Sequence, residues 1–419
     1  MHPRQQPFAF RDFRFFWTAR LCSTVAQNCM IVVIGWQVYD IARRTMDVKQ
    51  AALQLGFVGL AQFVPLLSLI LVTGWTADRF DRRRIARSCT TLQLLCAVIL
   101  ATLSWSGHLS LIWLFATSVV LGVARAFSMP ALSALAPNLV PPEVLPRAIA
   151  TNAIAARVGG ISGPALGGYL YTVAPFAPHL TSALLFATSV VAMLAIGPLR
   201  AARPSTMRNP WREMVEGLRY VRHNRLVLGA ISLDMFAVLL GGTTAMLPIF
   251  AHDILRTGAA GLGNLRAAPA LGAMIIALWF SYFPLKSHVG VKMLCAVAVF
   301  GAATVIFGLS RFLLLSLFCL ATLGAADMFS VYIRQSIIQI STPNQLRGRV
   351  GAVSSLFISA SNELGEAESG FLAAAIGPVA AVVGGGLGAI AVSLLWARWF
   401  PILRRARTFD EMRVERELA

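Results

Sequence analysis

Long apolar stretches recur from one end of this chain to the other, and each is long enough to cross a lipid bilayer as a helix. A spanning helix needs roughly 20 mostly apolar residues, and about twelve stretches qualify. With 57% hydrophobic and 13% charged residues, the chain also lacks the polar surface that a soluble protein needs. The sequence therefore predicts an all-α membrane protein with twelve transmembrane helices. They are expected near residues 15–40, 51–77, 85–105, 109–137, 144–173, 177–198, 225–251, 260–284, 290–310, 312–340, 346–373 and 377–400.

The distribution of basic residues predicts the orientation in the membrane. Of the 36 Lys and Arg residues, 26 fall in the termini, in the loops expected on the N-terminal side or at the span ends beside those loops, five fall in the opposite loops and five fall deeper inside spans. This asymmetry follows the positive-inside rule, so both termini are expected in the cytoplasm and the protein in the cell inner membrane. The net charge of +18 then serves topology and contacts with anionic membrane lipids, and nucleic acid is not an expected partner.

Neither the N-terminus nor the cysteines suggest processing or cross-linking. The opening residues, through "FAFRDFRFFW", lack the short apolar core and the small-residue cleavage site of a signal peptide. The six cysteines lie inside predicted spans without CxxC spacing, so we expect buried, reduced thiols and no metal site.

A basic, proline-containing segment separates the spans into two groups of six. Its apolar residues are spaced for one face of a helix that lies on the membrane surface; a simple tether is the alternative. These residues are Trp211, Met214, Val215, Leu218 and Val221. The predicted organisation is an N-terminal bundle (1–199), a cytoplasmic linker (200–224), a C-terminal bundle (225–403) and a charged tail (404–419).

The two groups of spans contain related sequences. A shift of 202 residues aligns the segment that starts at Gly122 with the segment that starts at Gly324. The matched pairs are Gly122 with Gly324, Phe127 with Phe329, Ser128 with Ser330, Pro141 with Pro343, Arg147 with Arg349, Gly163 with Gly365 and Gly168 with Gly370. Parallel repeats of this kind predict two six-helix bundles related by a pseudo-two-fold axis along the membrane normal, with a substrate site between them. Chance similarity between helices rich in Gly and Ala is the alternative.

The stretch "GWTADRFDRRR", from Gly74 to Arg84, concentrates charge between two apolar runs. It resembles the signature of the major facilitator superfamily, Gly-x-Leu-Ala-Asp-Arg-x-Gly-Arg-Arg, with Thr76 and Asp81 as departures. The resemblance implies the two-bundle fold and a cytoplasmic loop that latches a gate. The matching residues assigned to gating are Gly74, Asp78, Arg79, Arg82 and Arg83. A basic cluster that only sets topology is the alternative.

A second motif lies in the span expected at 144–173. The stretch "GGISGPALGG" resembles the glycine-rich element of drug:proton antiporters, and this implies gating roles for Gly163, Pro164, Gly167 and Gly168. Small residues let helices approach closely and a proline permits a kink, although generic tight packing would need the same residues. The stretches "GWQVYD" and "ARAFSMPALSALAPNLVP" are similar to the enterobactin-exporter and macrolide-efflux branch of the superfamily.

Ionisable residues inside spans are costly, so each is a candidate for function. The acids are Asp234, Asp327, Glu363, Glu366 and Glu368, and the basic residues are Arg20, Arg125, Arg157, Arg266 and Arg334. The repeat aligns Arg125 with Asp327, which predicts a proton-sensitive pair between bundles. Arg334, seven residues after Asp327, offers Asp327 a local partner instead.

Three further carboxylates are candidates for proton coupling. Asp234 is expected as a lone acid that carries a proton or contacts a cationic substrate, or else as a hydrogen-bonded structural acid. Glu363 and Glu366 share a helix face, where two close carboxylates favour a state in which one holds an exchangeable proton. Structural ion pairs with Arg157 or Arg266 are the alternative for both glutamates.

A large, mostly apolar cavity with a few polar anchors is expected around these charges. The residues assigned to it are Gln27, Asn28, Trp36, Gln37, Phe236 and Met246.

These features predict a secondary active transporter. The leading hypothesis is a proton-coupled exporter of small amphipathic molecules, of the drug or siderophore class, that works by alternating access as a monomer. A lipid or lysophospholipid transporter is the alternative. The expected energy source is the proton gradient, with no cofactor and no metal. An enzyme is not expected, because the chain has no Gly-x-Ser-x-Gly, His-Glu-x-x-His or Gly-x-x-x-x-Gly-Lys motif.

Overall fold

Every regular element in the described part of the chain is helical. The computed structural model describes residues 6–135, 138–197, 210–283, 285, 287–343, 345–406 and 408–409. The helices are α1 (Arg11–Arg43), α2 (Val48–Arg79), α3 (Arg82–Trp105), α4 (Leu111–Leu135), α5 (Leu145–Val173), α6 (Ala177–Leu194), α7 (Pro210–His223), α8 (Arg225–Leu240), α9 (Thr243–Ile249), α10 (Gly258–Tyr282), α11 (Val289–Leu309), α12 (Leu313–Ser341), α13 (Arg347–Ile376), α14 (Pro378–Trp399) and α15 (Pro401–Arg405), with short η2 (Pro7–Ala9) and η4 (Phe250–Ile254).

Hydropathy identifies most of these helices as membrane spans. Ten stretches of the described chain have the length and apolar character to cross a membrane. Helices α5 and α13 are equally long but fall outside that set: α13 carries three glutamates and two arginines, and α5 carries two arginines and five glycines. The predicted all-α, multi-span class is confirmed.

The chain forms two compact units that differ from the predicted halves at two segments. Unit 1 comprises Met1–Thr45, Leu60–Met207 and Thr257–Ala267, and unit 2 comprises Met46–Gly59, Arg208–Arg256 and Ala268–Ala419. The start of α2 thus belongs to unit 2, and the start of α10 belongs to unit 1.

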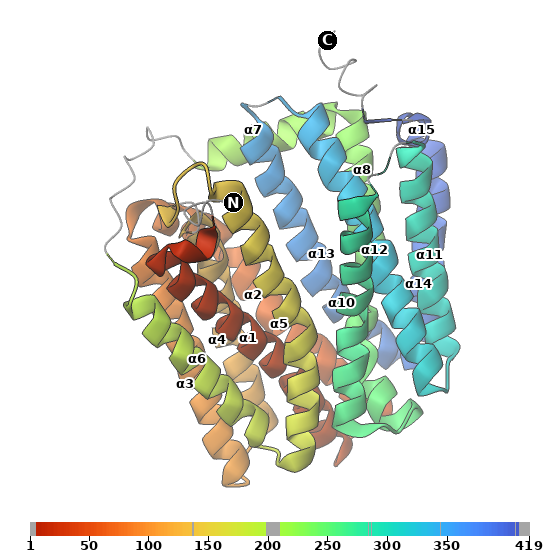
Figure 1. Ribbon diagram of the computed structural model, residues 1–419. Coiled ribbons are helices and arrows are strands. Elements are labelled where there is room, and N and C mark those ends of the chain that lie inside the picture. The colour runs from red at the N-terminus through yellow and green to blue at the C-terminus, as the bar shows by residue number, and fades with distance from the viewer. Residues whose placement is uncertain are drawn as a thin grey trace. The chain divides into compact units, whose positions relative to one another are not determined.

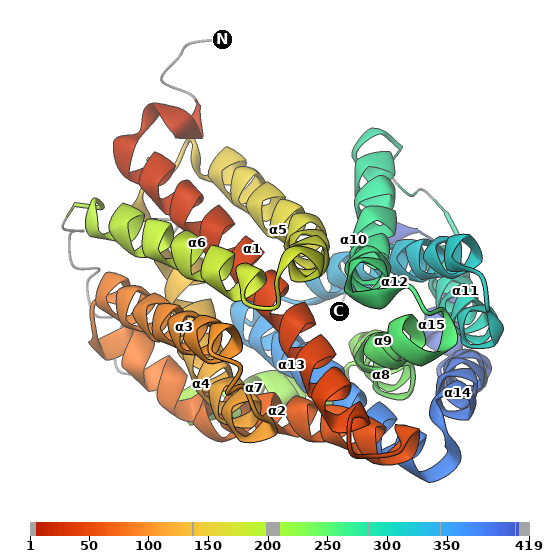
Figure 2. The same ribbon diagram turned by 90° about the horizontal axis from the view of Figure 1, so that it is seen from below.

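In unit 1, α1 packs against both α5 and α6, and the three helices lie side by side in Figure 2. Aromatic residues at the start of α1 explain how it is anchored. Phe13 and Phe16 are fully buried in a cluster that also contains Leu132 of α4 and Met193 of α6. Burial of side chains of this size is the main source of packing energy at this end of the unit.

In unit 2, α11 packs against both α12 and α14, and these helices are neighbours in Figures 1 and 2. The linker helix α7 lies on α13 and α8. Ion pairs from Arg349 of α13 to Glu213 and Glu216 of α7 hold it there.

The apolar residues of α7 do not form the single face that their spacing predicts. Val221 is 2% exposed and, with Met214, packs in a core cluster of unit 2, whereas Trp211, Val215 and Leu218 remain exposed. The surface helix is therefore present, but only one edge of it packs on protein. The exposed residues suit a membrane interface, where apolar side chains of such helices are buried. The linker residues 200–209 lie outside the described chain.

The span expected at 225–251 is interrupted. Helix α8 ends at Leu240, and α9 begins at Thr243 after Gly241 and Gly242. Adjacent glycines weaken a helix and permit a break. Broken helices inside transporters expose backbone groups at binding and coupling sites.

Glycines that the repeat aligns make equivalent close contacts in the two units. In unit 1, a Cβ on Gly122 of α4 would lie 2.9 Å from the carbonyl oxygen of Gln62 in α2. In unit 2, a Cβ on Gly324 of α12 would collide with the carbonyl of Pro269 in α10. The repeat therefore extends from sequence to helix packing.

This packing predicts the effect of a single methyl group. Gly324→Ala should destabilise the protein by about 1–3 kcal/mol, because the added Cβ meets backbone that has no room to yield. Gly384→Ala in α14 is the matched control: nothing lies within 4 Å of its Cβ position, so the better helix propensity of alanine should leave stability equal or higher. Thermal unfolding of the purified protein in detergent measures both, and equal effects would contradict the packing argument.

Candidate functional site

A cavity of about 200 Å³ lies in unit 1 among α1, α2, α3 and α4. Its lining residues are Arg20, Thr24, Gln27, Asn28, Met30, Ile31, Ile34, Gln62, Gln93, Leu121, Arg125 and Ser128. Polar side chains predominate, and the apolar ones come from α1 and α4. The wall is therefore more polar than the mostly apolar cavity that the sequence predicts, although polar groups beside apolar surface are typical of small-molecule sites.

Two guanidinium groups give this cavity its charge. Arg20 comes from α1 and Arg125 from α4, and no described lining residue is an aspartate or glutamate. The Nε atom of Arg20 is buried and has no hydrogen-bond partner among the described residues. A buried N–H of this kind is ready to donate to an acceptor that enters the cavity.

The structure separates the residues that were assigned to the substrate cavity. Gln27 and Asn28 line it. Gln37 does not: it is 2% exposed, with its side-chain oxygen 2.8 Å from Nε2 of His179 and its amide nitrogen donating to the carbonyl of Pro175. Trp36 is also buried and packs edge-on against Tyr171. Gln37 therefore lies outside the described cavity wall, and protein groups already satisfy its amide.

In unit 2, the residues assigned to the same cavity have other surroundings. Met246 of α9 is fully buried. Phe236 of α8 is 37% exposed, with its ring centroid 5.3 Å from that of Trp396.

A buried ion pair joins α8 and α12 in unit 2. Nη1 of Arg334 contacts Oδ2 of Asp234, and the two side chains are 2% and 5% exposed. Asp234 is therefore paired and is not the lone carboxylate that was expected, and its part in proton coupling stays a prediction. Arg334, expected beside Asp327 on its own helix, reaches across to α8 instead.

Asp327 lies beside this pair at a second, much smaller cavity. The cavity has a volume of about 10 Å³, and its wall includes Asp234, Asp327 and Ser330. A space of this size holds about one water molecule. The small cavity thus places Asp327 beside the carboxylate that Arg334 pairs.

The glutamates of α13 lie near the interrupted helix. Glu366 accepts a hydrogen bond of 3.2 Å from the hydroxyl of Thr244, at the start of α9, and Glu363 is 5% exposed. Oε2 of Glu368 is buried without a hydrogen-bond partner among the described residues. Whether Glu363 and Glu366 share a proton stays a prediction.

The glycine-rich stretch of α5 is a site of close helix contact. A Cβ on Gly163 would lie 2.7 Å from the carbonyl oxygen of Val25 in α1. A Cβ on Gly168 would lie 2.9 Å from the Cα atom of Gly263 in α10. Pro164 and Gly167 are buried in the same helix.

The repeat-related glycines of α13 make the corresponding contacts in unit 2. Gly365 packs on the backbone of Leu239 in α8, and Gly370 packs on that of Gly56 in α2. Phe57 and Phe371 stack edge to face beside this contact, with their centroids 5.6 Å apart. The starts of α2 and α10 are therefore held by equivalent glycines of the two repeats.

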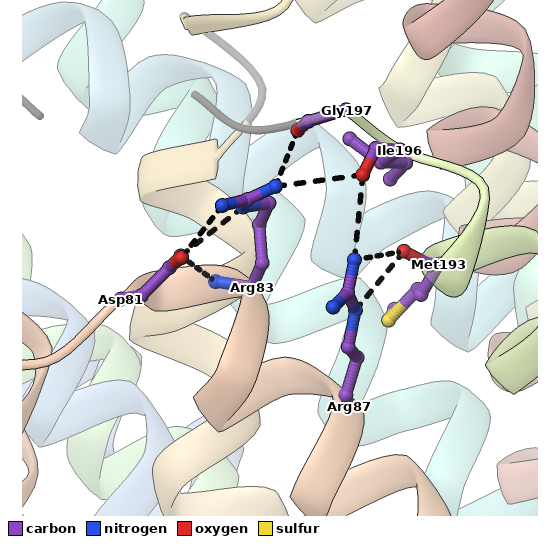
Figure 3. Close-up of polar contacts among 6 residues, drawn as sticks. All are labelled: Asp81, Arg83, Arg87, Met193, Ile196 and Gly197. Atoms are coloured by element: carbon purple, nitrogen blue, oxygen red, sulfur yellow. Dashed lines mark hydrogen bonds and ion pairs between the residues drawn. The ribbon is translucent and has the colours of Figure 1, made fainter. Parts of the chain in front are cut away.

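The charged stretch between α2 and α3 caps two helices (Figure 3). The side chain of Asp81 accepts a hydrogen bond of 2.9 Å from the backbone N–H of Arg83 and caps the start of α3. The guanidinium of Arg83 pairs with Asp81 at 2.7 Å and donates to the carbonyls of Ile196 and Gly197, just beyond α6. A cation at a helix C-terminus stabilises the negative end of the helix dipole.

The structure says less about the other residues of this stretch that were assigned to gating. The side chains of Gly74, Asp78 and Arg79 lie outside the described residues, and Arg82 is partly buried. Their gating roles stay predictions.

Sequence reasoning left several of these residues without a role. Arg20 was identified as a charge inside a span. The polar residues of α1 recur every three to four positions, and this spacing would have placed Arg20 on the same helix face as Gln27 and Asn28. Nothing in the sequence identified Gln62 and Gln93 as cavity residues, because single amides in apolar helices are common. Arg87 donates to the carbonyls of Met193 and Ile196 and also caps α6 (Figure 3).

The cysteine expectation holds in part. All six cysteines are free, but Cys22 is only partly buried and Cys295 is exposed.

Comparison with known protein families identifies the family of this chain. Residues 4–413 match the model of the transmembrane secretion effector family, a branch of the major facilitator superfamily. The chain belongs to this family. It is a multi-pass membrane transporter and not an enzyme, as expected.

Curated relatives of this transporter include exporters. It is 27% identical over 400 residues to the enterobactin exporter EntS of Escherichia coli O81, covering 94% of this chain and 93% of the relative. It is 27% identical over 388 residues to EntS of Shigella dysenteriae serotype 1, covering 91% and 90%.

Solved structures share the fold of the transporter. The POT family transporter PepTSo has a TM-score of 0.74 at 11% identity, covering 94% of this chain and 98% of that one. A bacterial homolog of the human lysosomal transporter Spinster has a TM-score of 0.67 at 16% identity, covering 94% and 99%. At these identities the likeness concerns the fold alone.

The buried ion pair predicts a non-additive response to mutation. Arg334→Met alone should lower the stability of the transporter by about 3–5 kcal/mol, because it leaves the carboxylate of Asp234 buried without its partner. The double variant Asp234→Leu/Arg334→Met should recover most of that loss. Thermal unfolding in detergent of both single variants and the double variant measures the coupling energy between the two side chains. If the stability losses of the single variants add up in the double variant, the two side chains are not coupled and the prediction fails.

The Asp81 cap predicts a pH dependence. The hydrogen bond from Arg83 lowers the pKa of Asp81 below its ordinary value of 3.8. The ionised cap therefore contributes stability above about pH 4, and the contribution is lost as the pH falls through the lowered pKa.

Two substitutions separate charge from capping. Asp81→Asn keeps a capping oxygen but removes the charge, whereas Asp81→Ala removes both and should cost about 1 kcal/mol at neutral pH. The stability difference between the wild type and Asp81→Asn, measured by thermal unfolding from pH 7 to pH 3, should shrink toward the acidic end. A difference that does not change with pH would exclude the charged cap.

Proposed function

We propose that this transporter is a proton-coupled exporter of small amphipathic molecules that works by alternating access. The observation that carries export is the similarity to curated enterobactin exporters over more than nine tenths of the chain. The polar cavity of unit 1 supports a small-molecule substrate, since its amides and guanidinium groups are placed to bind oxygen atoms.

Proton coupling is supported by the acids of unit 2. Asp327 and Asp234 line the same small cavity, and the partner of Asp234 is the buried Arg334. A proton that binds to Asp327 removes a negative charge next to this ion pair. Protonation and the position of α12 against α8 are thereby linked, and this link is what an antiporter requires.

The close glycine contacts support a gating role for α5 and α13. In an alternating-access cycle, the contacts of Gly168 with the start of α10 and of Gly370 with the start of α2 open and close. Small residues suit such contacts because no side chains must repack when the helices part. We place the transporter in the inner membrane as a monomer with both termini in the cytoplasm, in contact with anionic lipids.

The first test is the accumulation of a panel of dyes, antibiotics and siderophores in efflux-deficient cells that express the chain. Exclusion of a compound that depends on the protein and collapses with a protonophore is the expected result. Movement of lipid that persists with the protonophore would instead favour the alternative, a lipid or lysophospholipid transporter.

The role of Asp327 predicts the behaviour of one variant. Asp327→Asn should abolish efflux driven by the proton gradient, because the amide cannot take up and release the proton. The membrane level of the protein should not change. Asp47→Asn is the matched control: its carboxylate caps α2 in a loop, and asparagine keeps the capping oxygen. Normal gradient-driven efflux by Asp327→Asn would remove Asp327 from the mechanism.

A further inference from the structure

The cavity of unit 1 has cationic groups at its wall and no described anionic side chain. Arg20 and Arg125 line it together with the amides of Gln27, Asn28, Gln62 and Gln93. Each guanidinium presents several N–H donors and no acceptor, and an amide adds two donors and one acceptor. The chemistry of this wall therefore favours a ligand rich in oxygen acceptors.

The cost of burying Arg20 also favours an anionic ligand. A cation inside a membrane protein is expensive unless an opposite charge or water compensates it. The Nε atom of Arg20 is buried, and no described group accepts a hydrogen bond from it. An anionic oxygen that enters the cavity would supply that acceptor, and the bond would be stronger than one between neutral groups.

The apolar residues of the wall indicate the chemistry of the rest of the ligand. Met30, Ile31 and Ile34 of α1 and Leu121 of α4 provide apolar surface beside the polar groups. A planar oxyanion on an apolar body matches both parts of the wall, because the forked guanidinium fits a carboxylate bidentately.

Asp234, the acid that was expected to attract a cationic substrate, already has a cationic partner. Asp234 pairs with Arg334 and is 4% exposed, so it offers little to a ligand cation. The charges therefore give the two units different chemistry, with donors in unit 1 and carboxylates in unit 2.

We propose that the cavity bounded by α1, α2, α3 and α4 binds the substrate, and that this substrate is an organic anion with a carboxylate or similar planar oxyanion on an apolar body. Arg20 and Arg125 bind the oxyanion, and the apolar residues of α1 and α4 contact the body. This proposal rests on the proposed export function, because it names the substrate class of that exporter.

Three probes with one aromatic body and different charges test the substrate class. They are 2-naphthoate, 2-naphthamide and 2-naphthylmethylammonium, titrated into the purified full-length protein in detergent by isothermal calorimetry. Naphthoate should bind at least about tenfold more tightly than the neutral amide, as the difference of a charge-assisted hydrogen bond implies. Equal binding of all three, tighter binding of the ammonium or no binding of naphthoate would overturn the proposal.

The arginines are tested through the same discrimination. In Arg20→Gln and Arg125→Gln, the preference for naphthoate over naphthamide should fall at least about tenfold, whereas Arg20→Lys should keep part of it. Arg311→Gln, in an exposed loop, is the matched control and should keep the full preference. A ratio of two affinities is used because a general loss of folding would lower both. An unchanged ratio in both glutamine variants would exclude this cavity.

Efflux measured on the same variants separates this proposal from the proposed function. Protonophore-sensitive efflux by the wild type without anion preference would remove the anion site and leave the exporter. Anion binding that depends on both arginines, without efflux of any anion in the panel, would keep the site and count against export.

Discussion

Charge inside an apolar helix bundle needs an opposite charge or a polar cavity, and the interior of both units depends on this requirement. In unit 2, Arg334 and Asp234 satisfy it by pairing across α8 and α12 with almost no exposure. In unit 1, Arg20 and Arg125 lie at a cavity that is lined mostly by polar side chains. A bilayer offers no water to such charges, and we therefore place our proposed substrate and proton sites at these two arrangements.

The two repeats share a helix packing but differ in their charges. Gly122 and Gly324 allow the same close approach in their own units, and so do Gly168 and Gly370. At Arg125 and Asp327, by contrast, the aligned residues have opposite signs. A common backbone with different side chains lets one unit hold acceptor-rich substrate and the other exchange protons, which is the division that our two proposals describe.

Several site residues were predictable from residue type and spacing, and several were not. Asp234, Asp327 and Arg334 stand out because charges are rare in apolar stretches, but their partners depend on which helices are neighbours. Gln27 and Gln37 look alike in sequence, yet one lines a cavity and the other is occupied by His179. The break after Leu240 has a visible cause in Gly241 and Gly242, although glycine pairs in membrane helices often remain helical.

The sequence by itself determined the class of fold, the repeat and the superfamily, because hydropathy, glycine spacing and motifs can be read directly from the order of residues. Only the tertiary structure decided that Arg334 pairs with Asp234, that Arg83 caps α6 and that Arg20 faces a cavity with Arg125. The physical reason is that a buried charge takes its partner from whichever helix packs beside it. That neighbour lies a hundred residues or more away along the chain, where no local pattern records it.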